Sequence, residues 1–294
     1  MRFVERTAKS LGIDLRQPLS EGSICFLVAE HVRTHKVNGH LSMLSALSQW
    51  HQDQGFGELP RHRRFKEFQK GLQNMLAGVD AVERKCAFTE QHMLAFRATS
   101  NLSKFCDARD WAMCTMAWNG IMRESEYCDN ALRCRHVAIR TTQPHGAKIL
   151  VATVLISKTS SVPDNVYMAA RGDDLCPVAA TENYIRVATA QFGTRWRTES
   201  PFFFTSAPHV PLTCKLWSSI LKLRIIGIGL DPTKYATHSL RRGGTTAMFR
   251  ASIARDAIKR HGRWVSDAID AYNDWDVDGR RSEPTRQLAA ARPL

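Results

Sequence analysis

The pattern of apolar and polar positions over residues 1–80 is helical. A short helix is expected over residues 1–11, and Ser20 offers an N-terminal cap to the apolar run that follows it. Apolar side chains recur at helical spacing over residues 38–54, which predicts an amphipathic helix ended by a glycine-containing turn. Pro60 then opens a further helix. The N-terminal part is therefore expected to be a small four-helix domain.

The pattern changes after residues 80–88, a polar stretch without periodicity that we interpret as a linker. Thr89 caps a new helix, and the helix that follows Asp110 is apolar nearly all round, so it should be buried. Three β-like runs come next, over residues 134–140, 149–157 and 165–170, and they predict an antiparallel sheet. Further helices are expected at 177–191, 213–225, 238–251, 253–261 and 266–275.

These elements predict a mainly α (α+β) fold with two domains. The first, over residues 1–84, is the four-helix domain, and the second, over residues 85–294, is helical with a small three-stranded antiparallel sheet. The composition agrees with a folded chain, because 44% hydrophobic and 23% charged residues are close to globular averages.

The charge of the chain indicates what kind of partner it binds. The 294-residue chain has 41 lysines and arginines against 28 acids, a formal net charge of +13. Such a balance indicates a polyanionic partner, most often nucleic acid. A membrane partner is disfavoured because no run of apolar residues reaches the roughly 18 needed to span a bilayer. The 8 cysteines form no C-x-x-C pair, so neither a zinc site nor another metal site is predicted.

The sharpest basic cluster of the N-terminal part lies in the helix after Pro60. We predict that its side chains bind DNA phosphates, and the competing interpretation is an ordinary solvated helix face. The cluster consists of Arg61, Arg63, Arg64, Lys66 and Lys70.

A second candidate site lies near the C-terminus. His238 and Arg241 are three residues apart, so on a helix their Cβ atoms would lie about 5–6 Å apart on one face. An imidazole beside a guanidinium suits a single oxyanion, and a nearby tyrosine such as Tyr272 would be a nucleophile that needs no metal. The alternative from the residues alone is an amphipathic helix pair with incidental polar groups and a packed tyrosine.

Four separated motifs resemble, in order, those of the tyrosine recombinases (phage-integrase superfamily). More narrowly, they resemble eukaryotic transposon recombinases of the crypton and DIRS type. The first, NGIMRESE, resembles the family's first arginine box and contains Arg123; the second, ISKT, resembles the β-hairpin lysine motif at Lys158. The third, HSLR at 238–241 with Gly243, resembles the H-x-x-R box, and the fourth is Gly262-Arg263-Trp264 followed by Tyr272. Residues 38–80 resemble the helical core-binding domain of those elements.

The resemblance implies a DNA breaking-rejoining fold, with residues 1–84 as a SAM-like core-binding domain and residues 85–294 as the catalytic domain. It also implies site-specific cleavage and rejoining of duplex DNA through a 3′-phosphotyrosine, with no metal and no cofactor. Tyr272 would be the nucleophile and Lys158 the general acid for the leaving 5′ oxygen. Arg123 and Arg241 would neutralise the transition state, and His238 would assist proton movement.

One position departs from much of the family. Arg263 stands nine residues before Tyr272, where many members carry histidine or tryptophan. Arginine can donate to a phosphate oxygen but cannot act as a base, so proton transfer at this position is in question. Trp264 is expected to pack beneath the tyrosine helix. Glu126 is expected to support Arg123 or the neighbouring backbone, with an ordinary surface glutamate as the alternative.

The implied partner is double-stranded DNA, with a homotetramer on DNA that is compatible with a monomer in solution. A eukaryotic mobile element would place the protein in the nucleus, and a source that is not eukaryotic would place it in the cytoplasm or nucleoid. Two related alternatives stay open: a domesticated DNA-binding protein without catalysis, and a relaxing enzyme like the type IB topoisomerases. An RNA-binding scaffold is disfavoured because no RNA-recognition motif is present.

Overall fold

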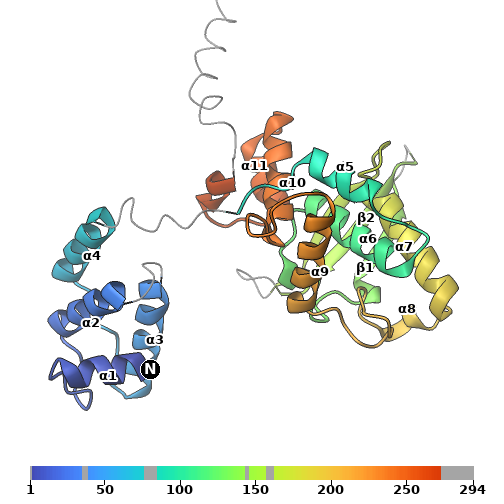
Figure 1. Cartoon of the computed structure of the whole chain (residues 1–294). Helices are drawn as coiled ribbons and strands as arrows, with labels where there is room; N and C mark the ends of the chain where they lie inside the picture. The colour runs from blue at the N-terminus through green and yellow to red at the C-terminus, as the bar shows by residue number, and fades with distance from the viewer. Residues whose placement is uncertain (1, 35–38, 76–84, 143–145, 157–161, 273–294) are drawn as a thin grey trace, which may run out of the picture. The chain divides into compact units, whose positions relative to one another are not determined.

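The computed structural model of the chain describes residues 2–34, 39–75, 85–142, 146–156 and 162–272, except for the side chains of Arg2, Gln73, Glu199, Ala271 and Tyr272. The chain divides into two compact units, Met1–Glu83 and Arg84–Leu294, which we call the N-terminal and C-terminal units (Figure 1). Within the described residues, no helix is both long and apolar enough to cross a membrane.

The described part of the N-terminal unit contains four helices, as the apolar periodicity predicted. They are α1 (Arg2–Ser10), α2 (Glu21–Thr34), α3 (Gly39–Asp53) and α4 (Arg63–Met75). The Ser20 hydroxyl accepts the Ser23 N–H at 3.1 Å, so it caps α2 as expected. At the end of α3, the buried His51 ring accepts the Leu19 N–H at 3.2 Å and donates to the Gly57 carbonyl at 2.9 Å. One ring therefore fixes the segment before α2 and the turn after α3.

The C-terminal unit is built around α6 (Phe105–Asn119), of which twelve of the fifteen residues are buried, as predicted. The helix was expected to follow Asp110, but it begins at Phe105. Asp110 lies inside the helix and accepts hydrogen bonds from Arg109 at 2.7 Å and Arg224 at 2.8 Å, so its buried charge is paired. The linker prediction was also too long at its C-terminal end, because Phe88 is fully buried and its N–H donates to the Ser239 carbonyl at 2.9 Å.

Other helices surround α6 in this unit (Figure 1). They are α5 (Glu90–Ala98), α7 (Pro177–Phe192), α8 (Trp196–Glu199), α9 (Cys214–Gly227), α10 (His238–Arg250) and α11 (Arg255–His261). Three short 3-10 helices complete them: η1 (Glu124–Glu126), η2 (Cys134–His136) and η3 (Asp267–Tyr272). Residues 134–136, predicted as strand, are therefore a 3-10 turn, and the first strand begins after them.

The sheet has three antiparallel strands in the order β1 (Val137–Thr141), β2 (Lys148–Val154) and β3 (Asp164–Ala169). Val166 and Met168 face inward, and a Cβ on Gly120 at the end of α6 would come within 2.9 Å of both side chains. The sheet therefore packs on the end of α6, just before the first arginine motif. The mainly helical fold with one small antiparallel sheet is confirmed.

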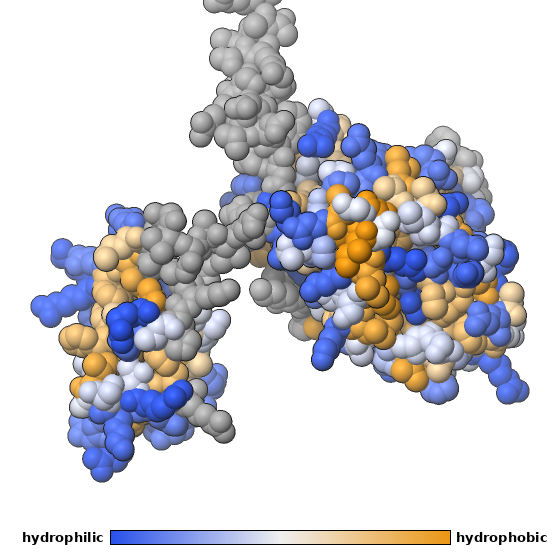
Figure 2. Space-filling model, in the orientation of Figure 1, coloured by the Kyte–Doolittle hydropathy of each residue, from blue (hydrophilic) through white to orange (hydrophobic). Residues whose placement is uncertain are grey.

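α9 is apolar on both faces. Its inner face buries Trp217, Leu221 and Ile225, while Leu223 and Ile226 on the outer face are 68% and 55% exposed. Figure 2 shows the resulting hydrophobic surface over this helix. α4 differs, because its outer face is charged.

Candidate active site

α10 packs against the end of α6 at a distance that only glycine permits. A Cβ on Gly243 would lie 1.9 Å from the Phe88 carbonyl oxygen, and one on Gly244 would lie 1.9 Å from the Trp118 carbonyl oxygen. The indole N–H of Trp118 donates to the same Phe88 carbonyl at 3.0 Å. This close approach carries Arg241, which precedes the glycines on α10, to the backbone that follows α6.

Arg241 is fully enclosed, with 0% of its surface exposed. Its Nη1 donates to the Ile121 carbonyl, and its Nη2 donates to the Gly262 carbonyl at 2.8 Å. The ring of Trp264 covers the guanidinium, with its centroid 4.0 Å from Cζ, a cation–π contact. Arg241 therefore ties the end of α6 to the segment after α11, and Trp264 separates it from solvent on that side.

The carboxylate of Glu126 is shared by two arginines and is itself fully buried. Oε1 accepts from Arg123 Nη1 at 3.0 Å, and Oε2 accepts from Arg263 Nη2 at 2.6 Å and from the Arg123 N–H at 2.9 Å. The Arg123 side chain keeps 19% of its surface exposed and that of Arg263 keeps 7%. Glu126 therefore orients two guanidiniums, and Arg123 is the more accessible of them.

The backbone is strained on both sides of this cluster. Ile121 has φ 39° and Arg263 has φ 58°, in a region that costs a non-glycine residue about 1–3 kcal/mol. The Ile121 carbonyl accepts from Arg241, and Arg263 is held by Glu126 and by the His261 carbonyl, to which its Nη1 donates at 3.1 Å. Its Nε is buried and finds no partner among the described residues.

His238 begins α10 beside the arginines. Partial removal of the ring from water lowers the pKa of His238 to about 4, and the positive charges of Arg241, Arg123 and Arg242 add to this effect. The imidazole is therefore neutral at pH 7. The preceding Thr237 donates its hydroxyl proton to Glu124 of η1, which fixes the start of α10 to the first arginine motif.

η3, the 3-10 helix that ends at Tyr272, is held by apolar packing and ion pairs. Ile269 is buried in a cluster with Ile121, Ile258 and Trp264. On the outside, Arg255 donates to Asp267 at 2.8 Å and Lys259 donates to it at 3.0 Å. These two hydrogen bonds lower the pKa of Asp267 to about 2. The backbone that leads to Tyr272 is thereby attached to α11 and to the end of α6.

The structure thus brings together four of the residues predicted from the motifs: Arg123, His238, Arg241 and Arg263. Lys158 and the Tyr272 side chain lie outside the described residues. Of the predicted phosphate ligands in the N-terminal unit, Arg63, Arg64, Lys66 and Lys70 lie on α4 with exposed side chains, and Arg61 precedes that helix. The catalytic and phosphate-binding roles of all these residues stay predictions.

The motifs include Gly243 and Trp264, but they did not predict what these two residues do. The Gly243–Gly244 pair determines how deeply α10 packs, and Trp264 covers Arg241 rather than only supporting the tyrosine helix. A double glycine inside a helical pattern was the one available signal, because it lowers helix stability and so requires a packing reason. The stacking of Trp264 on Arg241 has no signal in the spacing of the motifs.

No protein-family model and no curated protein matches the sequence. Solved structures do match the fold. XerH site-specific recombinase bound to palindromic difH substrate, in a post-cleavage complex, is similar over 98% of this chain and 76% of its own, with a TM-score of 0.66 and 11% identity. The Tn1549 transposon integrase in complex with circular intermediate DNA is similar over 96% of this chain and 90% of its own, with a TM-score of 0.62 and 11% identity. XerA recombinase covers 100% and 90%, with a TM-score of 0.51 and 14% identity. The chain therefore has the fold of the tyrosine recombinases.

Proposed function

We propose that this protein is a tyrosine-type DNA strand transferase, which cleaves and rejoins duplex DNA through a covalent phosphotyrosine. One observation carries the proposal. Arg123 and Arg263 share the buried Glu126 carboxylate, and the neutral His238 lies close to Arg123. Arg241 holds the backbone beside them by donating to the Gly262 carbonyl. Two oriented guanidiniums beside a neutral imidazole suit the charge of a phosphoryl-transfer transition state.

In the proposed reaction, the Tyr272 oxygen attacks phosphorus while the bond to the 5′ oxygen breaks. The phosphate stays joined to the 3′ end through tyrosine, so the energy of the phosphoester is retained for rejoining. Lys158 donates a proton to the leaving 5′ oxygen, and His238, neutral at pH 7, assists the movement of the tyrosine proton to solvent. Arg123 and Arg263 donate to the non-bridging oxygens, and Arg123 is the more exposed of the two.

Arg241 differs from Arg123 because its side chain is fully buried and cannot reach a phosphate in this structure. Both of its terminal nitrogens donate to backbone carbonyls, and Trp264 covers its face. We propose that Trp264 moves away when DNA binds, which opens the guanidinium to the phosphate. Until then Arg241 is a positioning residue that sets the backbone on which Arg123 and Arg263 stand.

The narrower assignments rest on the motifs. The four boxes resemble those of crypton- and DIRS-type recombinases, so we propose that the protein serves a mobile element and acts in the nucleus of its host. Recombination joins two duplexes and cuts four strands, so a tetramer on DNA is proposed as the active assembly. The N-terminal unit binds DNA through the exposed basic side chains of α4, which predicts a steep loss of affinity with rising salt.

The test is formation of a covalent adduct. Duplexes that bind the full chain are first selected from a randomised pool. A set of selected duplexes is then prepared with a nick at successive positions, so that cleavage next to a nick releases a short fragment and traps the covalent intermediate. We expect wild type to give an adduct that survives SDS and disappears on protease digestion, and Tyr272→Phe to bind the same DNA without one. Binding without any wild-type adduct would support a silent DNA-binding protein, and relaxation of supercoils without sequence preference would support a topoisomerase.

A further inference from the structure

His261 is the last residue of α11, and its ring lies against the end of α6. Its Nε2 is 2.8 Å from the carbonyl oxygen of Asn119, which stands 142 positions earlier in the chain. Asn119 is the last residue of α6 and the first residue of the motif that contains Arg123. The last carbonyls of a helix find no donor within that helix, so a donor from elsewhere has to satisfy them. The His261 ring therefore joins the segment before Arg263 to the start of the Arg123 motif.

The surroundings of the ring determine its charge. Partial removal from water lowers the pKa of His261, and the positive charges of Arg263 and Arg241 lower it further, against the opposite effect of the hydrogen bond to Asn119. The ring is therefore neutral at pH 7 and has a single N–H. Because a carbonyl oxygen can only accept, that N–H is on Nε2. The ring is thus an uncharged donor close to two arginines.

Asn119, the acceptor, is itself fixed. Its side-chain Nδ2 donates to the Thr115 carbonyl at 2.8 Å, within α6. The same nitrogen donates to the Leu175 carbonyl at 3.1 Å, in the segment between β3 and α7. The carbonyl that His261 contacts therefore belongs to a residue that is tied to two other parts of the C-terminal unit.

The backbone of His261 also holds Arg263. The His261 carbonyl accepts from Arg263 Nη1 at 3.1 Å, and the next carbonyl, that of Gly262, accepts from Arg241 Nη2 at 2.8 Å. Arg263 itself has the left-handed φ of 58°. Glu126 holds the tip of the Arg263 side chain, whereas the ring and the carbonyl of His261 hold the turn from which that side chain extends.

We propose that His261 is a positioning residue for strand transfer, which sets Arg263 relative to Arg123 through the hydrogen bond of its ring to Asn119. His261 does not touch the phosphate. Without this donor the left-handed turn is free to shift against the end of α6, and the two guanidiniums no longer match the non-bridging oxygens. A displacement of about 1 Å at a reacting centre is enough to lower a rate by about a hundredfold. The inference rests on the proposed strand transfer, because a positioning residue has a role only where there is a reaction.

The test compares two variants that differ in the donor. His261→Gln keeps an N–H that reaches the place of Nε2, and His261→Leu fills the space without a donor. Single-turnover adduct formation on nicked duplex, measured over a range of DNA concentrations, gives the rate at saturation separately from the affinity. We expect His261→Leu to lower the rate at saturation by about ten- to a hundredfold and to leave the affinity for DNA unchanged, with His261→Gln close to wild type.

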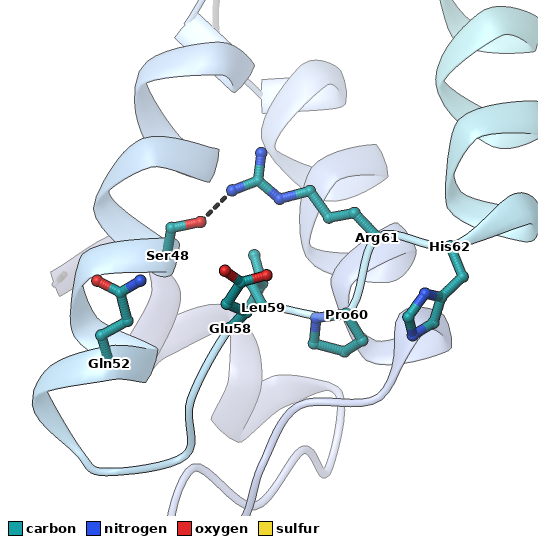
Figure 3. A pocket seen from close by; sticks show the side chains of 7 residues that line it. All are labelled: Ser48, Gln52, Glu58, Leu59, Pro60, Arg61 and His62. Atoms are coloured by element: carbon teal, nitrogen blue, oxygen red, sulfur yellow. Dashed lines mark hydrogen bonds between the residues drawn. The ribbon is translucent and has the colours of Figure 1, made fainter.

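His62→Leu is the matched control. This exposed histidine lines a cleft of the N-terminal unit, between α3 and the loop that leads into α4 (Figure 3). Its substitution should leave the adduct rate at saturating DNA near that of wild type. Circular dichroism and thermal unfolding establish that each variant is folded, and His261→Met, which also lacks a donor, replaces His261→Leu if the latter does not fold.

Two results would overturn the positioning role and leave strand transfer in place. In the first, His261→Leu unfolds at a lower temperature or binds DNA more weakly, yet forms the adduct at the wild-type rate at saturation. In the second, His261→Gln is as slow as His261→Leu, so the donated hydrogen bond is not what matters. Absence of any adduct from wild type gives a third and distinct result, which refutes strand transfer and this role together.

Discussion

Two carboxylates of this chain bind arginine at similar distances in opposite surroundings. On α4, Glu67 accepts from Arg63 at 2.8 Å, with side chains 62% and 91% exposed. In the C-terminal unit, Glu126 accepts from Arg123 at 3.0 Å and from Arg263 at 2.6 Å, and its own side chain is 0% exposed. Water screens the first pair, whereas burial of the second removes its charges from water. That desolvation cost is offset only by well-placed hydrogen bonds between the buried groups. The contact distance is therefore a poor guide to what each group does.

The difference suits two tasks that one polyanion requires. Exposed cations on α4 keep their hydration and mobility, so they can follow a phosphate backbone without selecting a sequence. Enclosed cations around Glu126 are held in place by their hydrogen bonds, so their reorganisation would contribute little to the barrier of the proposed strand transfer. Substitutions chosen in matched pairs across the two surroundings test this comparison.

The largest effect is expected at Arg241, the most enclosed cation of the cluster. In Arg241→Ala, the Ile121 and Gly262 carbonyls lose their donors, and the strained backbone on which Arg123 and Arg263 stand loses its tie. The rate of adduct formation should fall by at least about a hundredfold, the scale of a lost transition-state donor. Single-turnover kinetics with nicked duplex measure it, and circular dichroism establishes that the variant is folded.

Arg64→Ala on α4 is the matched control, since its side chain is exposed. It should weaken binding at moderate salt and leave the adduct rate at saturating DNA near that of wild type. Equal losses of rate in the two variants would contradict the division between enclosed and exposed arginines.

The second effect separates the two carboxylates. Glu126→Gln removes a buried charge that two guanidiniums share, so it should lower the free energy of unfolding by about 3 kcal/mol. Glu67→Gln should change it by less than about 1 kcal/mol, because its pair is screened by water. Urea unfolding followed by tryptophan fluorescence and circular dichroism gives both values. A Glu126→Gln protein as stable as Glu67→Gln would show that burial does not distinguish the pairs.

Much of the fold was predictable, because periodicity records which side of a helix is buried. α3 was expected over residues 38–54 and spans Gly39–Asp53, and α10 was expected over 238–251 and spans His238–Arg250. The start of α6 was not predictable in the same way. A carboxylate such as Asp110 is not expected inside a buried helix, but Arg224 pairs with it from 114 residues further along the chain. Long-range pairing of a buried charge leaves no trace in local spacing.

The candidate site shows the same limit. Motif order was enough to select Arg123, His238, Arg241 and Arg263, which the structure brings together. It was not enough to foresee that Trp264 covers Arg241, because side-chain direction at Arg263 and Trp264 follows from the left-handed backbone at φ 58°. A spacing rule assumes regular helix, and the chain leaves that geometry at this point.

The third effect concerns the close approach that positions Arg241. Gly244→Ala would place a Cβ 1.9 Å from the Trp118 carbonyl oxygen, so α10 must move away from α6, at a cost of about 1–3 kcal/mol or more. Gly71→Ala on α4 is the opposite case, since nothing lies within 4 Å of an added Cβ. It should stabilise the protein by up to about 1 kcal/mol through helix propensity. Thermal unfolding of both variants checks the signs, and destabilisation by Gly71→Ala or stabilisation by Gly244→Ala would refute the packing argument.

The smallest effect is expected at His238. This residue is exposed like the arginines of α4, but it also lies close to the enclosed arginines of the C-terminal unit. Its pKa of about 4 lies below the ordinary 6.5, so the folded protein resists protonation of the ring. Its contribution to stability is therefore complete above pH 6.5 and is lost as the pH falls from 6.5 through 4. The adduct rate should accordingly show no step near pH 6.5 that depends on this histidine. NMR resonances of the histidine rings follow the titration directly, and the His238→Gln variant assigns the resonance of His238. A midpoint between pH 6 and 7 would show that burial and the neighbouring arginines do not control the charge of this ring.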